Sequence, residues 1–116
     1  MLTPEEAIEQ GALTVADLAA WRREPGVAHV LIDVRESWEV EAASIPGAIH
    51  VPMQRVPAEI GARAVDDRPM VIVCHHGGRS HMVTEWMRAN GFERAVNLLG
   101  GVDAWSIEID PTVPRY

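Results

Sequence analysis

The pattern of apolar and polar positions alternates between short apolar runs and longer segments with apolar residues at helical spacing. Two runs, Val30–Val34 and Met70–Cys74, are almost wholly apolar and have the length of a strand. Runs of this kind are typical of central strands that are covered on both faces. Shorter runs predict three further strands, at residues 12–14, 49–51 and 95–98.

Helices are predicted between these strands from spacing and from capping residues. Thr3 precedes a proline and two acidic residues, and Asp17 stands three residues after Thr14, so both threonines are expected to be N-caps. Further helical segments are expected at residues 36–43, 57–63, 80–89 and 101–105. Strands that alternate with helices at short spacing predict an α/β fold, with a central parallel sheet and helices on both faces.

Large apolar side chains outside the strands are expected to pack in the core or at its edge. They are Trp38, Trp86 and Trp105, together with the stripe formed by Met82, Val83, Trp86 and Met87. The charged residues Asp33 and Arg35 follow the first apolar run, and we expect them to form a structural ion pair, because buried charges need partners.

The length of 116 residues allows one main domain, with residues 1–12 as an N-terminal extension and residues 13–116 as the domain itself. The acidic start of the chain has no apolar run of the kind found in secretory signals, and no window approaches a membrane span. We therefore expect a cytoplasmic protein without a membrane partner. The formal net charge of −7 also disfavours nucleic acid as a partner.

The segment that carries candidate chemistry begins at Cys74, the only cysteine, where the second apolar run ends. In open parallel sheets the ligand site lies at the carboxyl ends of the strands. Loop N–H groups and the dipole of the next helix can bind an anion there. We therefore expect the Cys74 thiol to ionise more readily than a free cysteine, with Arg79 as an anion-binding residue and Ser80 as a helix N-cap.

Other interpretations of this segment stay open. Cys74 could be a buried structural thiol, as cysteines often are. The rings of His75 and His76 could tune the thiolate and the choice of donor, or could point into solvent. A metal site formed by Cys74, His75, His76 and His81 is disfavoured, because adjacent ligands strain a tetrahedral site.

Four segments of the chain, in order, resemble landmarks of single-domain rhodaneses, the thiosulfate sulfurtransferase family. They are Leu31–Glu36, the Ile45–Ile49 segment containing Ile-Pro-Gly-Ala, the loop Cys74–Arg79, and the glycine pair and helix Gly100–Trp105. The resemblance covers roughly residues 13–105, and the last residues, 109–116, resemble tails of small rhodaneses and of rhodanese domains fused to adenylyltransferases. One departure is that Ala-Ser at positions 43–44 stands where the family commonly has Gly-His.

The resemblance implies a rhodanese-like fold and covalent catalysis without a cofactor or a metal. Cys74 would take the outer sulfur of thiosulfate or a similar small anionic donor, and would pass it from a persulfide to an acceptor. The implied substrate-binding residues are His75, His76, Gly77, Gly78, Arg79 and Ser80. Because no second cysteine can resolve the persulfide, the acceptor is expected to be an external thiol, a sulfur-carrier protein or, in an assay, cyanide.

The resemblance also defines the alternatives. Related phosphatases and arsenate reductases place five residues between cysteine and arginine, whereas four separate Cys74 from Arg79, so the loop suits one sulfur atom better than a phosphate. A binding module of different function is the other alternative. It would keep the fold and either lack catalysis or sense the redox state through Cys74.

Overall fold

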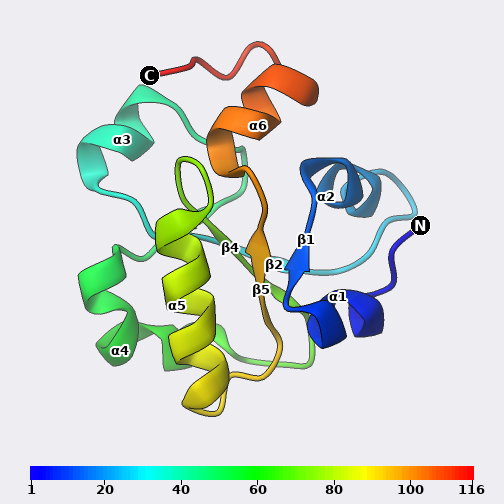
Figure 1. Ribbon diagram of the computed structural model, residues 1–116, viewed down its shortest axis with the longest axis vertical. Helices are drawn as coiled ribbons and strands as arrows, with labels where there is room; N and C mark the ends of the chain where they lie inside the picture. Colours follow the sequence, from blue (N-terminus) through cyan, green and yellow to red (C-terminus); the bar gives the residue numbers. More distant parts are fainter.

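Five parallel strands form the centre of the computed structural model, which describes residues 1–116. The strands are β1 (Ala12–Leu13), β2 (Val30–Asp33), β3 (Ile49–His50), β4 (Met70–Val73) and β5 (Ala95–Leu98). They lie in the order β1-β5-β4-β2-β3, and each neighbouring pair is parallel. The predicted parallel sheet is therefore confirmed, with β4 in its middle and its carboxyl end next to that of β2 (Figure 1).

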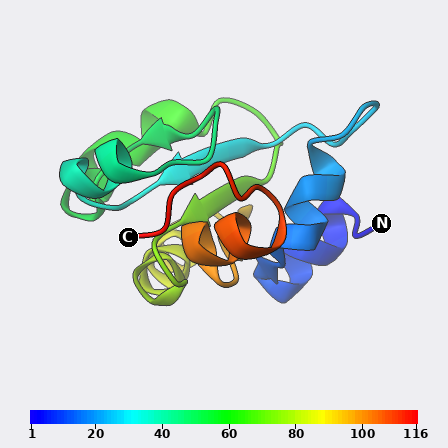
Figure 2. The same cartoon turned by 90° about the horizontal axis from the view of Figure 1, so that it is seen from above.

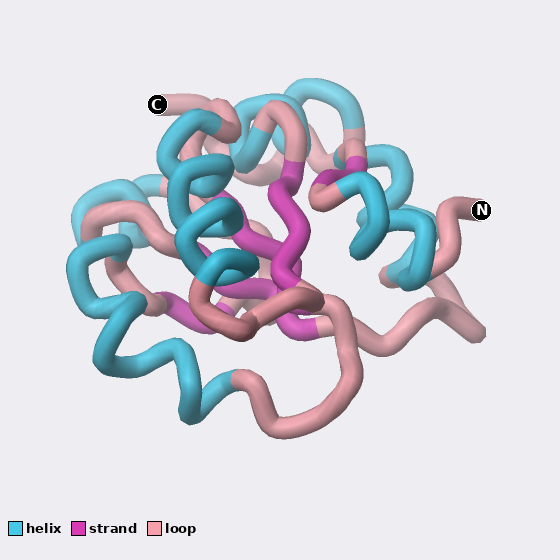
Figure 3. Tube along the Cα trace, turned by 60° about the horizontal axis from the view of Figure 1, so that its bottom comes forward, coloured by secondary structure: helices cyan, strands magenta, loops and turns pink.

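Helices cover both faces of this sheet. They are α1 (Pro4–Gln10), α2 (Val15–Trp21), α3 (Ser37–Ala42), α4 (Val56–Glu59), α5 (Gly78–Ala89) and α6 (Gly101–Glu108), with short 3₁₀ turns η1 (Met53–Arg55) and η2 (Ile60–Arg63). In Figure 1 the strands run between α4 and α5 on the left and α1 and α2 on the right. Figure 3 shows the same strands enclosed by helices. No helix has the length and apolar character needed to cross a bilayer.

The alternation of side chains along β4 divides the core into two layers. Val71 and Val73 pack in the layer that contains α1, α2 and α6. Ile72 and Cys74 point the other way, into the layer that contains α4 and α5. Both faces of the strand are therefore apolar, which explains why its sequence shows no alternation. The same alternation directs the Cys74 side chain toward α5, the helix that follows it.

The first residues of the chain pack on the sheet. Thr3 and Thr14 form the predicted caps, each in a capping box with the acidic residue three positions later. Ala7 of α1 is fully buried, and Trp21 Nε1 donates a hydrogen bond to the carbonyl oxygen of Leu2 at 2.7 Å. The side chains of α1 therefore contribute to the same core layer as α2 and α6.

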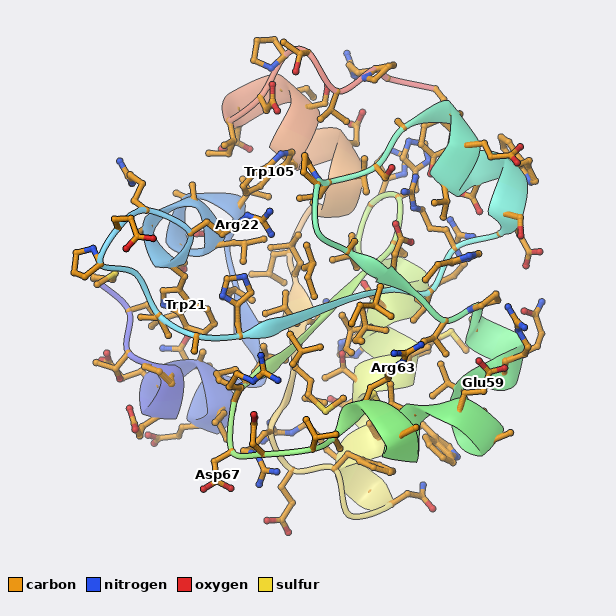
Figure 4. The ribbon with its side chains drawn as sticks, turned by 180° about the vertical axis from the view of Figure 1, so that it is seen from behind. Trp21, Arg22, Glu59, Arg63, Asp67 and Trp105 are labelled. Carbon is orange, nitrogen blue, oxygen red and sulfur yellow. The ribbon has the colours of Figure 1, made fainter.

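The contact between α2 and α6 also holds the Ile-Pro-Gly-Ala segment. The Arg22 guanidinium lies 5.9 Å from the centre of the Trp105 ring (Figure 4) and donates a hydrogen bond to the carbonyl oxygen of Pro46. One arginine thus connects the two helices to the turn before β3.

Several sequence predictions about packing and boundaries were wrong. Trp38, Met82 and Trp86 are 63%, 60% and 37% exposed, because each lies on the outer side of its helix, whereas Trp105 is buried as predicted. Helix α5 begins at Gly78, two residues earlier than expected, and its N-cap is Gly77. Ser80 therefore does not cap the helix, because it already lies inside the first turn.

Candidate active site

The Cys74 side chain lies at the carboxyl end of the middle strand, in the loop that leads into α5. The loop is at the upper end of the sheet in Figure 1, between α3 and α6. The thiol is 1% exposed. Its Sγ accepts a hydrogen bond from the backbone N–H of Gly77 at 3.1 Å and lies 3.2 Å from Ser80 Oγ. The sulfur is thus held by a loop amide at the N-terminus of a helix, as the sequence predicted.

Two glycines allow the loop to take this shape. Gly77 has φ +109°, in the left-handed region that favours glycine. Gly101 opens α6 against the loop, where a Cβ atom would lie 2.3 Å from the carbonyl oxygen of Cys74. The N–H groups of Val102 and Asp103 donate to the carbonyl oxygens of Cys74 and His75, at 2.9 and 3.0 Å. The first turn of α6 therefore satisfies two loop carbonyls.

Ser80 and Asn97 form a buried polar contact behind the sulfur. Ser80 Oγ donates to Asn97 Oδ1 at 2.5 Å, and Asn97 Nδ2 donates to the carbonyl oxygen of Gly77 at 3.3 Å. Both side chains are at most 3% exposed. The sequence analysis did not select Asn97. The available signal was one amide in the otherwise apolar run of β5, where an uncharged polar side chain needs a partner.

Arg79 forms a two-pronged ion pair with Glu39 of α3. Its Nη1 and Nη2 atoms lie 2.7 and 2.8 Å from the two carboxylate oxygens. These bonds lower the pKa of Glu39 from 4.5 to about 2 and raise the pKa of Arg79. The Arg79 side chain is still 38% exposed, while that of Glu39 is 4% exposed. The arginine is thus fixed beside the loop rather than free in solvent.

The predicted ion pair of Asp33 and Arg35 is present and buried, with side chains 1% and 0% exposed. Arg35 Nη2 lies 2.6 Å from Asp33 Oδ2, and it also donates to the carbonyl oxygen of Ala43 at 2.6 Å. Arg35 Nη1 donates to the hydroxyl of Tyr116 at 2.8 Å. This pair therefore ties the end of β2 to α3 and to the C-terminal residues.

The C-terminal residues return to the loop, a feature that the sequence analysis missed. Figure 2 shows the last residues crossing between α3 and α6. Tyr116 donates a hydrogen bond to Glu39 Oε2 at 2.7 Å, and its ring stacks on His75 at 4.0 Å between centres. Burial raises the pKa of Tyr116 to about 12. The ring of Trp38 meets Tyr116 edge-on at 5.8 Å, which gives the exposed tryptophan one partner.

The two loop histidines stack on each other, with ring centres 3.9 Å apart. Burial lowers the pKa of His75, which favours its neutral form. His76 Nε2 lies 3.6 Å from Asp103 Oδ2, and one ligand atom from each of His75, His76 and Asp103 lies within 4.8 Å of the others. These three residues, and not Cys74 or His81, have the spacing that could hold a metal ion. Asp103 is already paired with Arg115 at 2.9 Å.

A family model described as the rhodanese-like domain matches residues 14–108 of the chain. The chain belongs to the rhodanese family. It is 34% identical over 77 residues to a sulfurtransferase of Allochromatium vinosum, covering 66% of this chain and 71% of that protein. It is 31% identical over 103 residues to the adenylyltransferase and sulfurtransferase MOCS3 of Oryza sativa, covering 78% of this chain and 23% of that protein.

Solved structures agree with this assignment. The rhodanese-like domain protein from Staphylococcus aureus superposes with a TM-score of 0.72 at 30% identity, covering 90% of this chain and 97% of that one. The chain spans only 22% to 30% of the length of several curated relatives that it matches. The resemblance to the rhodanese sulfurtransferase family is therefore confirmed, and Cys74 occupies its active-site loop.

Proposed function

We propose that this protein transfers a sulfane sulfur from thiosulfate, or a similar small anionic donor, to an external thiol through a persulfide on Cys74. The observation that carries the proposal is the position of the Cys74 sulfur. It is the only thiol of the chain, it lies at the carboxyl end of the middle strand, and a loop amide donates to it at 3.1 Å. Donors in such a loop stabilise negative charge on sulfur.

The proposed transfer has two balanced steps. The Cys74 thiolate attacks the outer sulfur of thiosulfate, a new S–S bond forms, and sulfite leaves with the electron pair of the bond that breaks. An acceptor thiolate then attacks the terminal sulfur and leaves as a persulfide, while Cys74 returns to the thiolate. Neither step needs an oxidant or a reductant, because the sulfur atom carries its oxidation state from donor to acceptor.

The loop from His75 to Ser80 is the proposed binding site for the donor. The backbone N–H groups at the start of α5 supply partial positive charge without a titrating group. Arg79 can add an N–H donor, because Glu39 occupies two of the five that a guanidinium carries. Four residues between Cys74 and Arg79 suit a single sulfur atom better than a phosphate, which disfavours phosphatase activity.

The acceptor is proposed to be an external thiol or a sulfur-carrier protein. Cys74 is the only cysteine, so no thiol of this chain can take the sulfur from it. Relatives of the chain include proteins with sulfurtransferase names and YrkF of Bacillus subtilis, which has a sulfur-carrier name. These names support a role in passing sulfur between proteins or small thiols.

The test is steady-state release of sulfite from thiosulfate with cyanide as acceptor. We expect turnover by the wild type, none by Cys74→Ser, and unchanged turnover by His81→Gln, a matched substitution of an exposed residue on the outer side of α5. No turnover by the wild type with thiosulfate or with a small organic persulfide as donor would contradict the proposal. That result would instead favour a binding or redox-sensing module.

A further inference from the structure

The hydroxyl of Ser80 has one proton and two neighbours that could receive it. Ser80 Oγ lies 2.5 Å from Asn97 Oδ1 and 3.2 Å from Cys74 Sγ. All three side chains are at most 3% exposed, so they are shielded from bulk solvent. The destination of this proton therefore affects the charge state of the sulfur.

The orientation of the Asn97 amide decides where the proton lies in this structure. Its Nδ2 donates to the carbonyl oxygen of Gly77 at 3.3 Å, which turns Oδ1 toward Ser80. An amide oxygen cannot donate, so the short contact requires the Ser80 proton. Ser80 then presents only a lone pair to the sulfur. The matching state of Cys74 is the thiol, whose S–H donates to Ser80 Oγ.

The thiolate calls for a different arrangement. A negatively charged sulfur accepts hydrogen bonds, so the Ser80 hydroxyl would have to rotate and donate to it beside the Gly77 N–H. That rotation leaves Asn97 Oδ1 buried without a donor, which is unfavourable. The hydrogen bond that stabilises the resting loop thus opposes ionisation of the nucleophile.

We propose that Asn97 is a positioning residue that draws the Ser80 proton away from the sulfur, so that Cys74 rests as the thiol and gains a second donor only when the Ser80 hydroxyl rotates. This inference rests on the proposed function, since it concerns the nucleophile of that reaction. The loop then has two states, which differ in whether the Ser80 hydroxyl donates its proton to Asn97 or to the Cys74 sulfur.

The test is the pH at which Cys74 ionises, measured by the far-ultraviolet absorbance of its thiolate with Cys74→Ser as the blank. Because the chain has one cysteine, the signal reports a single group. In Asn97→Ala the Ser80 proton is free for the sulfur, so we expect the midpoint to fall by about 0.5–1 pH unit. No fall in this variant would overturn the proposal.

A double-mutant cycle separates the proton from any structural effect of Asn97. Adding Asn97→Ala to Ser80→Ala should leave the midpoint unchanged, since no hydroxyl proton remains to be redirected. An equal fall on both backgrounds would mean that Asn97 acts through loop shape, and would refute the proposal. Thr84→Val is the matched control, because it removes another buried hydroxyl of α5, one that has no hydrogen-bond partner, and it should not move the midpoint.

The titration and the sulfur transfer can fail independently. A wild type that transfers sulfur neither from thiosulfate nor from a small organic persulfide contradicts the proposed function, whatever the titration gives. A wild type that transfers sulfur while the cycle shows no coupling between Ser80 and Asn97 contradicts only the role of Asn97. Urea unfolding of each variant shows that the midpoint is read from folded protein.

Discussion

The carboxyl ends of β2 and β4 lie side by side, yet polar groups are buried there in opposite ways. At the end of β2, Asp33 and Arg35 are charged, and each is matched by a fixed partner. At the end of β4, Cys74, Ser80 and Asn97 are joined by hydrogen bonds that depend on one shared proton. One strand end is built for rigidity and the other for a change of state.

The physical reason lies in the cost of rearrangement. Moving either partner of the Asp33–Arg35 pair would leave a buried charge unpaired, which costs several kcal/mol. Rotating the Ser80 hydroxyl costs only one neutral hydrogen bond. The buried charges of Asp33 and Arg35 therefore hold the end of β2 in place next to the site. The hydrogen-bond contacts of the Cys74 sulfur are with neutral groups, Ser80 Oγ and the Gly77 N–H.

Removing the Asp33–Arg35 ion pair at the end of β2 should have the largest effect on stability. Arg35→Ala leaves Asp33 buried and unpaired and removes donors to Ala43 and Tyr116, so we expect the free energy of unfolding to fall by about 3–5 kcal/mol. Urea unfolding measures this loss. Arg115→Ala, which removes an exposed pair, is the control and should change stability little. Similar losses in both variants would contradict the comparison.

Disturbing the contact between α6 and the active-site loop should have the second largest effect. A Cβ at Gly101 would lie 2.5 Å from the carbonyl oxygen of His75, so Gly101→Ala should destabilise the protein by about 2–3 kcal/mol and lower sulfite release at least about tenfold. Gly78→Ala is the matched control, because a Cβ there meets no atom within 4 Å. Gly78→Ala should leave the free energy of unfolding unchanged or raise it by up to about 1 kcal/mol. Equal losses of stability in the two variants would contradict the assigned role of Gly101.

The decrease in the free energy of unfolding at low pH should report the Glu39–Arg79 ion pair. Folding lowers the pKa of Glu39 from 4.5 to about 2, so its contribution is present above about pH 4.5 and is lost as the pH falls toward 2. Allowing for solvent screening at the partly exposed Arg79, we expect Glu39→Gln to remove about 2 kcal/mol of this dependence. Stability curves between pH 2 and 6 measure it, with the exposed Glu59→Gln as control.

The ionisation of Tyr116 offers the smallest and most local test. It is the only tyrosine, so difference absorbance reports it alone, and we expect a pKa of about 12 because the side chain is partly buried. The raised pKa means that its stabilising contribution is lost as the pH rises from about 10 to 12. Glu39→Gln should lower the midpoint, since a nearby negative charge is removed. An ordinary midpoint in the wild type would mean that the C-terminal residues do not cover the loop in solution.

The sequence predicted the strands well because apolar runs in parallel sheets are local signals. Val30–Val34 and Met70–Cys74 differ from the observed strands by one residue each. It also predicted the position of Cys74 at the strand end, because the residue directly follows the apolar run. Partnerships between distant segments could not be predicted in this way. Glu39 and Arg79 are 40 residues apart, and nothing in their local pattern says that they meet.

The same limit explains the remaining errors. Trp38 was expected to pack in the core or at its edge, but it lies on the outer side of α3 and is largely exposed. Ser80 was taken as an N-cap from its place after the loop, whereas glycines let the helix begin earlier. Tyr116 lies in an irregular segment, where no periodicity indicates which side chain faces the protein.

The central claim is that Cys74 carries the transferred sulfur as a persulfide. The most direct measurement is the intact mass of the protein after brief incubation with thiosulfate, compared with Cys74→Ser. The account predicts a gain of one sulfur atom, about 32 Da, in the wild type only, and its loss on adding a reductant. An unchanged wild-type mass in folded protein with both thiosulfate and a small organic persulfide, or the same gain in Cys74→Ser, would contradict it.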